Sequence, residues 1–587
     1  MSDALLHMAI GPVQSFIAAA RRSRDLWFGS FVLSEVAKAA ARVARDWQDG
    51  KGATLLFPSP EVPLEPSDGP VVDGEPVTPA PNKLLVRVTG GDVGDLAQQM
   101  ADAAHAEFAR AAGKVQQSCA DLIRDDAAQV WEEQVSTLLQ IDWAFSAYDG
   151  TGKSRAAIEA AVEEAKTLRP FRAIKHHLEG AFKSAFDGAG DSVLVRRPKA
   201  TRSISPREQQ ALARFQQYRI DAREGLDAIG LLKRAGGRPE QFVPLTNVAL
   251  AHWLDRSPAG LMSAVDRECR ALRVLSRVVR PDLRCGQVFT FDAQIFLDDR
   301  LPHIAREYDL SDDQMKPLKD AIRAARKALR EPVPYVACLV GDGDRLGAHL
   351  KSRSLDELPA ISKALAEFSQ AALAIVAQES GLPIYAGGDD VLAFLPLNTA
   401  LTCARRLRDE YMRRVSTVHF GGEATFSVGI GIGHVLDSMG DLLELGREAE
   451  QLAKGDDLDE DDQRDALALV MEKRGGQRRV WRRQWKDDAA ARVEAARERL
   501  HARTLPVGKL FELDTLLTRL PDVSADDLAR YAQGILRRAE PGAGEDRPGG
   551  LSLADVKLEP CNHQTLRAFV ELHVIARLLV AAIAEEK

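Results

Sequence analysis

The sequence has few cysteines, and none of them are paired. Six cysteines occur in 587 residues, and no two of them show the Cys-x-x-Cys spacing that structural zinc sites and redox motifs use. The spacing therefore argues against a thiolate zinc site, and we expect the chain to bind no zinc. It also indicates a compartment in which thiols stay reduced.

Long apolar runs and an excess of positive charge are also absent. No run of 18 uninterrupted apolar residues occurs, and the apolar run that precedes Arg21 is too short for a signal peptide. The formal net charge is -8, so any contact with nucleic acid must be local or shared with a partner. These absences predict a cytoplasmic protein that does not interact with a membrane.

The order of predicted strands and helices repeats within the chain. Strand, helix, two strands, helix and strand are predicted in residues 1–150 and again in 331–486, which is the ferredoxin-like (βαββαβ) order. Residues 151–330 are predicted to form a mostly helical middle domain, and 487–587 a helical C-terminal domain. We therefore predict an α+β protein with two ferredoxin-like units, of which the first is catalytically silent because it has no acidic hairpin.

The stretch GLPIYAGGDDVLAFLPL predicts a β-hairpin in the second unit. Two apolar runs, residues 382–386 and 391–395, flank the tetrapeptide Gly-Gly-Asp-Asp. The tip of this hairpin places Asp389 beside Asp390. Two adjacent carboxylates repel each other unless a positive charge lies between them, so the hairpin suggests a cation site.

A second acidic motif, GDGDRLG at residues 341–347, follows the first strand of the same unit. In a ferredoxin-like sheet that strand lies beside the hairpin, so we expect Asp342 to meet Asp389 and Asp390. Each motif alone could be an ordinary turn, because Asp and Gly dominate turns. Together they favour a site for Mg²⁺ or Mn²⁺ formed by three catalytic, metal-binding carboxylates.

With the N-terminal stretch IGPVQSFIAAARRSRDLWFGSFVLSEVAKAAA, these motifs resemble the large catalytic subunit of type III-B CRISPR effector (Cmr) complexes. Further motifs occur in the family's order across nearly the whole chain: FPSP, PNKLL, EGLDAIGLLKR, DGDRLG, YAGGDDVLAFLP, SVGIGIGH, REAEQLAKG and ALVMEKRGG. The resemblance implies a cyclase-like palm that polymerises ATP into cyclic oligoadenylates once the complex binds a foreign transcript. It implies as partners the other Cmr subunits, the guide CRISPR RNA and the target RNA. Two alternatives stay open: ATP joined to another acceptor such as S-adenosylmethionine, and a catalytically silent scaffold.

The resemblance also implies roles for individual residues. The three carboxylates match the family's metal ligands, and Lys454 matches a lysine that contacts phosphate in related palms, although lysines are also common at exposed helix ends. Glycines near the carboxylates would let the backbone approach a triphosphate closely. The expected nucleotide-binding residues are Gly343, Asp344, Gly387, Gly388, Ser427 and Lys454.

The sequence departs from the family pattern in two respects. Many relatives begin with a metal-dependent HD nuclease domain, whereas this sequence starts at the GPVQ unit and contains no His-Asp dipeptide. We therefore expect the form that lacks this domain, and no DNase activity from it. Relatives also often hold a zinc in the middle region through paired cysteines, which are absent here.

The basic stretch KRGGQRRVWRRQWK, residues 473–486, allows more than one interpretation. Interleaved cations and tryptophans suit contact with phosphates and stacking on bases. The same composition suits a cationic face that docks on an acidic partner subunit, or a solvated face over buried tryptophans. The sequence does not decide among these.

Overall fold

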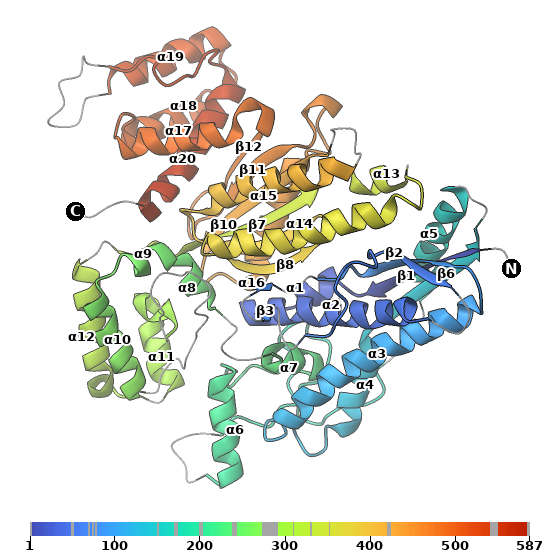
Figure 1. Cartoon of the computed structure of the whole chain (residues 1–587). Coiled ribbons are helices and arrows are strands. Elements are labelled where there is room, and N and C mark those ends of the chain that lie inside the picture. The colour runs from blue at the N-terminus through green and yellow to red at the C-terminus, as the bar shows by residue number, and fades with distance from the viewer. Residues whose placement is uncertain are drawn as a thin grey trace.

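The computed structural model describes most of the chain, and every structural statement below refers to that part. The protein is of the α+β class, with two main sheets and helices packed around them (Figure 1). The described residues are 3–47, 52–67, 71–72, 75–76, 79–148, 152–169, 174–198, 204–237, 243–272, 291–308, 310–328, 331–351, 353–418, 424–539 and 550–583.

The first sheet has four strands in the order β2-β5-β1-β6, with every neighbouring pair antiparallel. On the central strand, alternate side chains turn to opposite faces: Leu6, Met8 and Ile10 join the core under α2 and α3, whereas Leu5 faces α5. The strands are β1 (Ala4–Gly11), β2 (Ala53–Phe57), β5 (Lys83–Val88) and β6 (Gln140–Ala147), beside a small ribbon of β3 (Val71–Val72) and β4 (Glu75–Pro76).

The second sheet has six strands in the order β12-β11-β10-β7-β9-β8. All pairs are antiparallel except β10 with β11, which is parallel. Helices α14 and α15 cover one face, and α16 covers the other (Figure 1). The strands are β7 (Tyr335–Gly343), β8 (Leu382–Gly387), β9 (Asp390–Leu395), β10 (Phe426–His434), β11 (Ala466–Met471) and β12 (Arg479–Gln484).

Strands β11 and β12 were not predicted from the sequence. The run ALALVM of β11 is buried at every position, which is typical of a strand covered on both faces. The following turn returns the chain antiparallel as β12. A short apolar run between an acidic loop and a Gly-Gly turn was the available signal.

The helices of the first half surround the first sheet and form the middle region. The order of elements in the sequence predicts one helix between β5 and β6, but this segment divides into α3 and α4, because Leu122 and Ile123 are buried against residues 193–195 instead of continuing the helix. The helices are α1 (Gln14–Ala18), α2 (Ser23–Arg45), α3 (Val93–Ser118), α4 (Ala128–Leu138), α5 (Gly152–Thr167), α6 (Pro206–Gln217), α7 (Ala228–Ala235), α8 (Leu245–Ala249), α9 (Ala251–Asp255), α10 (Ala259–Leu272), α11 (Leu301–Glu307) and α12 (Asp312–Ala328).

The helices of the second half flank the second sheet and form the C-terminal region. Helix α20 packs on β12 and on α17 and α18, so the C-terminal helices share a core with this sheet. The helices are α13 (Leu346–Lys351), α14 (Leu358–Gln378), α15 (Ala400–Val415), α16 (Met439–Lys454), α17 (Ala489–His501), α18 (Val507–Arg519), α19 (Ala525–Arg537) and α20 (His563–Ile583).

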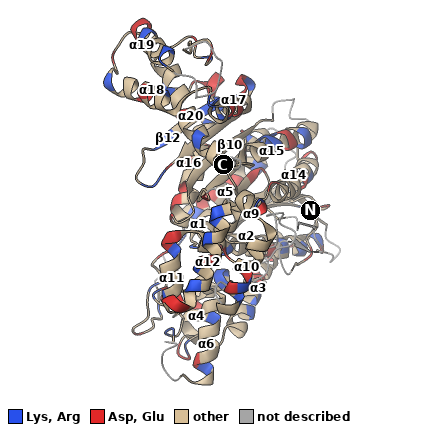
Figure 2. Cartoon of the chain, turned by 90° about the vertical axis from the view of Figure 1, so that its left-hand side faces the viewer, with Lys and Arg blue, Asp and Glu red and all other residues tan. Residues whose placement is uncertain are grey.

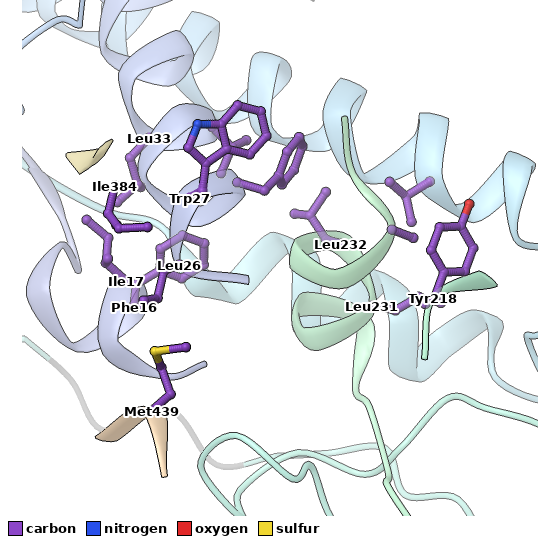
Figure 3. Packing of buried hydrophobic residues seen from close by; sticks show 14 of the residues in the cluster. Phe16, Ile17, Leu26, Trp27, Leu33, Tyr218, Leu231, Leu232, Ile384 and Met439 are labelled. Carbon is purple, nitrogen blue, oxygen red and sulfur yellow. The ribbon is translucent and has the colours of Figure 1, made fainter. Parts of the chain in front are cut away.

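One hydrophobic core joins the two sheets. Phe16 and Leu26, from α1 and α2, belong to the same buried cluster as Ile384 on β8 and Met439 at the start of α16 (Figure 3). Burial of apolar surface contributes about 25 cal/mol per Å², so a shared core favours a fixed arrangement of the two sheets.

Helix α14 is long and apolar enough to cross a membrane by length and composition alone. It packs against β8, β9 and α15, and half of its apolar window is buried in the fold. Core helices of globular proteins meet the same criterion, so this helix is weak evidence for a membrane span.

Candidate functional site

Three carboxylates meet where β7 ends and the β8–β9 hairpin turns. The register pairs Gly341 with Val391, and one further step along both strands brings Asp342 opposite Asp390. Asp389 occupies the turn of the hairpin. One oxygen from each of these carboxylates lies within 4.8 Å of the others, so the structure brings together the three residues expected to meet.

The turn of the hairpin contains two residues, Gly388 and Asp389, because Gly387 pairs with Asp390. Gly388 has a φ of 70°, a left-handed conformation that glycine adopts without strain. The hydroxyl of Ser369 on α14 donates a hydrogen bond of 3.1 Å to the Gly388 carbonyl. A buried helix therefore fixes the position of the turn.

Lys454 is a cation that lies beside the carboxylates. Asp342 lies on the same face of β7 as Val336 and Cys338, which point toward α16. Lys454 is the last residue of α16, and its Nζ lies 2.5 Å from Asp342 Oδ2. It also pairs with Glu450, one turn earlier. The structure therefore joins Lys454 to the predicted cluster.

The carboxylates interact unfavourably with one another. Burial raises the pKa of Asp389, and the charge of Asp342 raises it further. Burial also raises the pKa of Asp390, together with a hydrogen bond to Asp342 and the charge of Asp389. Burial lowers the pKa of Lys454, but the carboxylates of Asp342 and Glu450 more than offset this and raise it. One lysine therefore does not neutralise the cluster.

Three of the nearby glycines are required for packing. A Cβ at any of them would lie within 2.6 Å of an aromatic side chain, so a larger residue there would force its neighbour to move. Gly388, at the turn, has open space where its side chain would be. The occupied positions are Gly341 against Phe426, Gly343 against Tyr411, and Gly387 against Tyr385.

Asp344 and Ser427, which were expected to bind nucleotide, are hydrogen-bonded to each other. The Ser427 hydroxyl donates to Asp344 Oδ1 at 2.7 Å, and Thr425 and the Asp465 amide donate to Oδ2 at 2.8 and 3.0 Å. Asp344 is 4% exposed and Ser427 is fully buried. Both residues are therefore buried, and their hydrogen bonds hold the end of β7.

Two tyrosines near the carboxylates were missed in the sequence. Burial raises the pKa of both Tyr385 and Tyr411, and the neighbouring carboxylates raise it further. Tyr411 packs edge-on against Phe368 at a ring distance of 5.0 Å. Nothing in the local sequence of α15 distinguishes Tyr411 from an ordinary core residue, so only the fold reveals its position.

Most side chains of the basic stretch 473–486 contact other parts of the protein. Trp481 is buried in the core, and Trp485 lies under Arg408 at 5.5 Å. Arg479 pairs with Asp514 at 2.6 Å, and Arg482 donates to the carbonyl of Ala453 at 3.2 Å. In the view of Figure 2, basic and acidic residues are interspersed over the chain. Because Trp481 is buried, a base cannot stack on it.

Two family models match this sequence in regions that contain most of the strands of the two sheets. The model for the N-terminal region of the CRISPR-associated protein Cmr2 matches residues 5–133, and the model for the second palm domain of Cas10/Cmr2 matches residues 335–468. Two separate regions of the chain are thus similar to the Cas10/Cmr2 family. The second match contains the whole carboxylate cluster and Lys454, so the candidate site lies in the family's second palm domain.

One curated relative is also similar to part of this chain. The Cmr subunit Cmr2 of Pyrococcus furiosus is 33% identical over 166 residues, covering 24% of this chain and 19% of that protein. The aligned segment thus spans about a fifth of that curated relative.

Two solved structures share the fold over almost the whole chain. The apo type III-B Cmr-beta structure has a TM-score of 0.65 at 11% identity, covering 98% of this chain and 82% of the other. Cmr-beta bound to cognate target RNA has a TM-score of 0.62 at 12% identity, covering 98% and 83%. At these identities the likeness shows the fold alone.

Proposed function

We propose that this Cas10/Cmr2 protein is the nucleotidyltransferase of a type III-B CRISPR effector complex, and that target RNA activates it to make cyclic oligoadenylates from ATP. The observation that carries this proposal is the convergence of Asp342, Asp389 and Asp390 within 4.8 Å in the second palm. A scaffold would gain nothing from repulsive carboxylates at a hairpin turn.

The three carboxylates fit a divalent cation. Their hard oxygen atoms are ligands that Mg²⁺ and Mn²⁺ prefer, and their raised pKa values indicate a site that lacks positive charge. We propose that Asp342, Asp389 and Asp390 hold this cation. When bound there, a divalent cation lowers the pKa of an attacking hydroxyl and stabilises the charge of a departing pyrophosphate.

The chain's own residues would position the triphosphate of ATP. Gly388 leaves the turn open, so the phosphates would lie over the hairpin and contact its backbone. Lys454 is poised beside Asp342 and would donate to a phosphate oxygen once the cation takes over the charge of Asp342. Asp344 and Ser427 would act as positioning residues, because their polar atoms hold the end of β7.

The finer architecture is part of the same proposal. Each main sheet contains a βαββαβ segment whose strands have the spatial order 4-1-3-2, which supports two ferredoxin-like palm units. We propose the first, residues 1–150, as a silent partner of the catalytic palm, residues 331–486. The helical regions 151–330 and 487–587 would be the remaining domains.

The partners follow from the family and from the solved relatives. One relative with this fold is Cmr-beta bound to cognate target RNA, which supports guide and target RNA and the other Cmr subunits as partners of this chain. A cytoplasmic location, and signalling rather than DNA cleavage as the output, stay predictions.

The test uses the assembled complex with its guide RNA. The complex is incubated with ATP, Mg²⁺ and complementary RNA, and the products are identified by mass spectrometry. We expect cyclic oligoadenylates from the wild type and none from the Asp389→Ala/Asp390→Ala variant, with assembly and RNA binding unchanged. Asp409→Ala, on an exposed part of α15, is the matched control.

Other results would separate the alternatives. Adducts of ATP with S-adenosylmethionine, formed only when that compound is added, would replace the proposed product. Full yield from the double variant would refute the assignment of the carboxylates, and no nucleotide product from the wild type would leave the scaffold as the function.

A further inference from the structure

A polar cavity lies far from the carboxylates. It has a volume of about 800 Å³ and is bounded by the N-terminus of α2, residues 217–224, α8 and the turn at 435–440. This volume is within the range of pockets that hold small ligands.

The cavity and the carboxylates lie at opposite ends of the strand β10. Ser427, near the start of β10, lies opposite Asp342, whereas the turn at 435–440 follows the other end of the strand. Eight residues at about 3.3 Å each separate the two ends by about 26 Å. The cavity is therefore not part of the site proposed for ATP polymerisation.

The lining of the cavity carries more positive than negative charge. Six arginines and four carboxylates line it. Glu224 is paired with Arg234 at 2.9 Å, and Asp292 is paired with Arg219. Asp437 is paired with Arg474, which lies outside the lining, at 2.9 Å. Three of the four carboxylates are therefore already engaged.

Several guanidinium groups at the cavity keep unused donors. Arg22 donates to the carbonyl of Arg219 at 2.7 Å, and Arg300 donates to Gln294 at 3.0 Å. Among the described residues neither has a carboxylate at ion-pair distance. Nη2 of Arg219 is buried and has no hydrogen-bond partner in the described part of the chain. Unused donors of this kind favour an anionic ligand, because buried polar groups are normally bonded.

Two further features point to an anion. Burial, and after it the neighbouring charge of Arg234, lower the pKa of Arg22 to about 10. Helix α16, of 16 residues, begins at the cavity, where Ser438 caps it and Gly440 lies in its first turn. The N-terminus of a helix adds partial positive charge.

We propose that this arginine cavity binds a free nucleotide through its phosphates. Guanidinium groups match phosphate oxygens two at a time, unlike a single ammonium group. The cavity is larger than one phosphate requires, and the rings of Phe186 and Tyr218 on its wall offer apolar surface for a base. A nucleoside polyphosphate satisfies both parts of the lining.

The binding test uses the full chain in EDTA. Without a divalent cation the carboxylate cluster repels a triphosphate, whereas the arginine cavity needs no metal. We expect ATP to bind in isothermal titration calorimetry, pyrophosphate to bind more weakly, and adenosine not to bind. Adenosine binding as tightly as ATP would overturn the role of the phosphates, and pyrophosphate binding as tightly as ATP would overturn recognition of a nucleotide.

Variants separate this cavity from other basic surfaces. Arg22→Gln/Arg300→Gln should weaken ATP binding at least tenfold, since each charge-assisted hydrogen bond contributes about a factor of ten. Arg267→Gln/Arg323→Gln, at exposed positions, removes the same charge elsewhere and should not change the affinity. Unchanged affinity in the cavity variant would refute the site.

A third variant tests the proposal if the change at Arg22 destabilises the fold. Should the Arg22 change lower the melting temperature, Arg300→Glu at the half-buried rim tests the same point alone. It should still weaken ATP binding at least tenfold. Binding that persists in this variant would also refute the proposal.

Discussion

Replacing Asp389 with Asn should stabilise the second palm when no divalent cation is present. Two unit charges 4.8 Å apart repel by about 3.5 kcal/mol at an effective dielectric of about 20. Lys454 offsets part of this through its ion pair with Asp342, so we expect a net gain of about 1–3 kcal/mol. For a domain of this size the palm should melt roughly 2–10 °C higher.

The assay is scanning calorimetry of the full chain in EDTA at neutral pH. Asp409→Asn on the same palm, where the carboxylate is 63% exposed, is the matched control and should melt like the wild type. Equal melting of Asp389→Asn and the control, or a lower value for Asp389→Asn, would refute the electrostatic account.

The pH dependence gives a second test of the same prediction. The pKa values of Asp389 and Asp390 are raised in the folded state above their unfolded values, so these carboxyls cost folding free energy at neutral pH. This cost falls as the pH drops below the folded pKa values, and it vanishes near the ordinary carboxyl pKa of the unfolded chain. The advantage of Asp389→Asn should therefore shrink between pH 7.5 and 5, and an advantage that grows on acidification would contradict the argument.

Four further predictions follow from the same structure. Millimolar Mn²⁺ or Mg²⁺ should raise the melting temperature of the wild type but not of the Asp389→Ala/Asp390→Ala variant, and an equal rise in both would exclude the cluster as the cation site. Gly343→Ala should cost about 1–3 kcal/mol because its Cβ meets Tyr411; Tyr411→Phe should restore part of this, and Gly347→Ala, in open space, should be nearly neutral. Arg234→Met should cost about 3–5 kcal/mol by leaving two buried carboxylates unpaired, which denaturant melts would measure. Lys454→Met should lower product yield about tenfold or more in the assembled complex, and unchanged yield would remove Lys454 from the site.

Much of the second palm could be predicted from local sequence. The hairpin and the strand before GDGDRLG were expected at nearly their observed bounds, because alternating apolar runs and glycine-rich turns are local signals. The stretch QIDWAFSA also predicts a strand, and β6 forms over these residues. The strand β12 was missed, because its buried positions are Arg479, Trp481 and Gln484, so no apolar alternation marks it in the sequence.

The sequence by itself determined that three carboxylates are available at the end of a strand and in the turn of a hairpin, and it indicated the family that the chain resembles. Spacing along the chain is enough for this, because strand order in a repeated βαββαβ pattern restricts which ends can meet. Only the tertiary structure decided what surrounds them. It filled the space beside Gly343 with Tyr411, turned Ser427 toward Asp344, and buried Trp481. These outcomes depend on packing between residues far apart in sequence, and local patterns carry no information about which side chain occupies a given space.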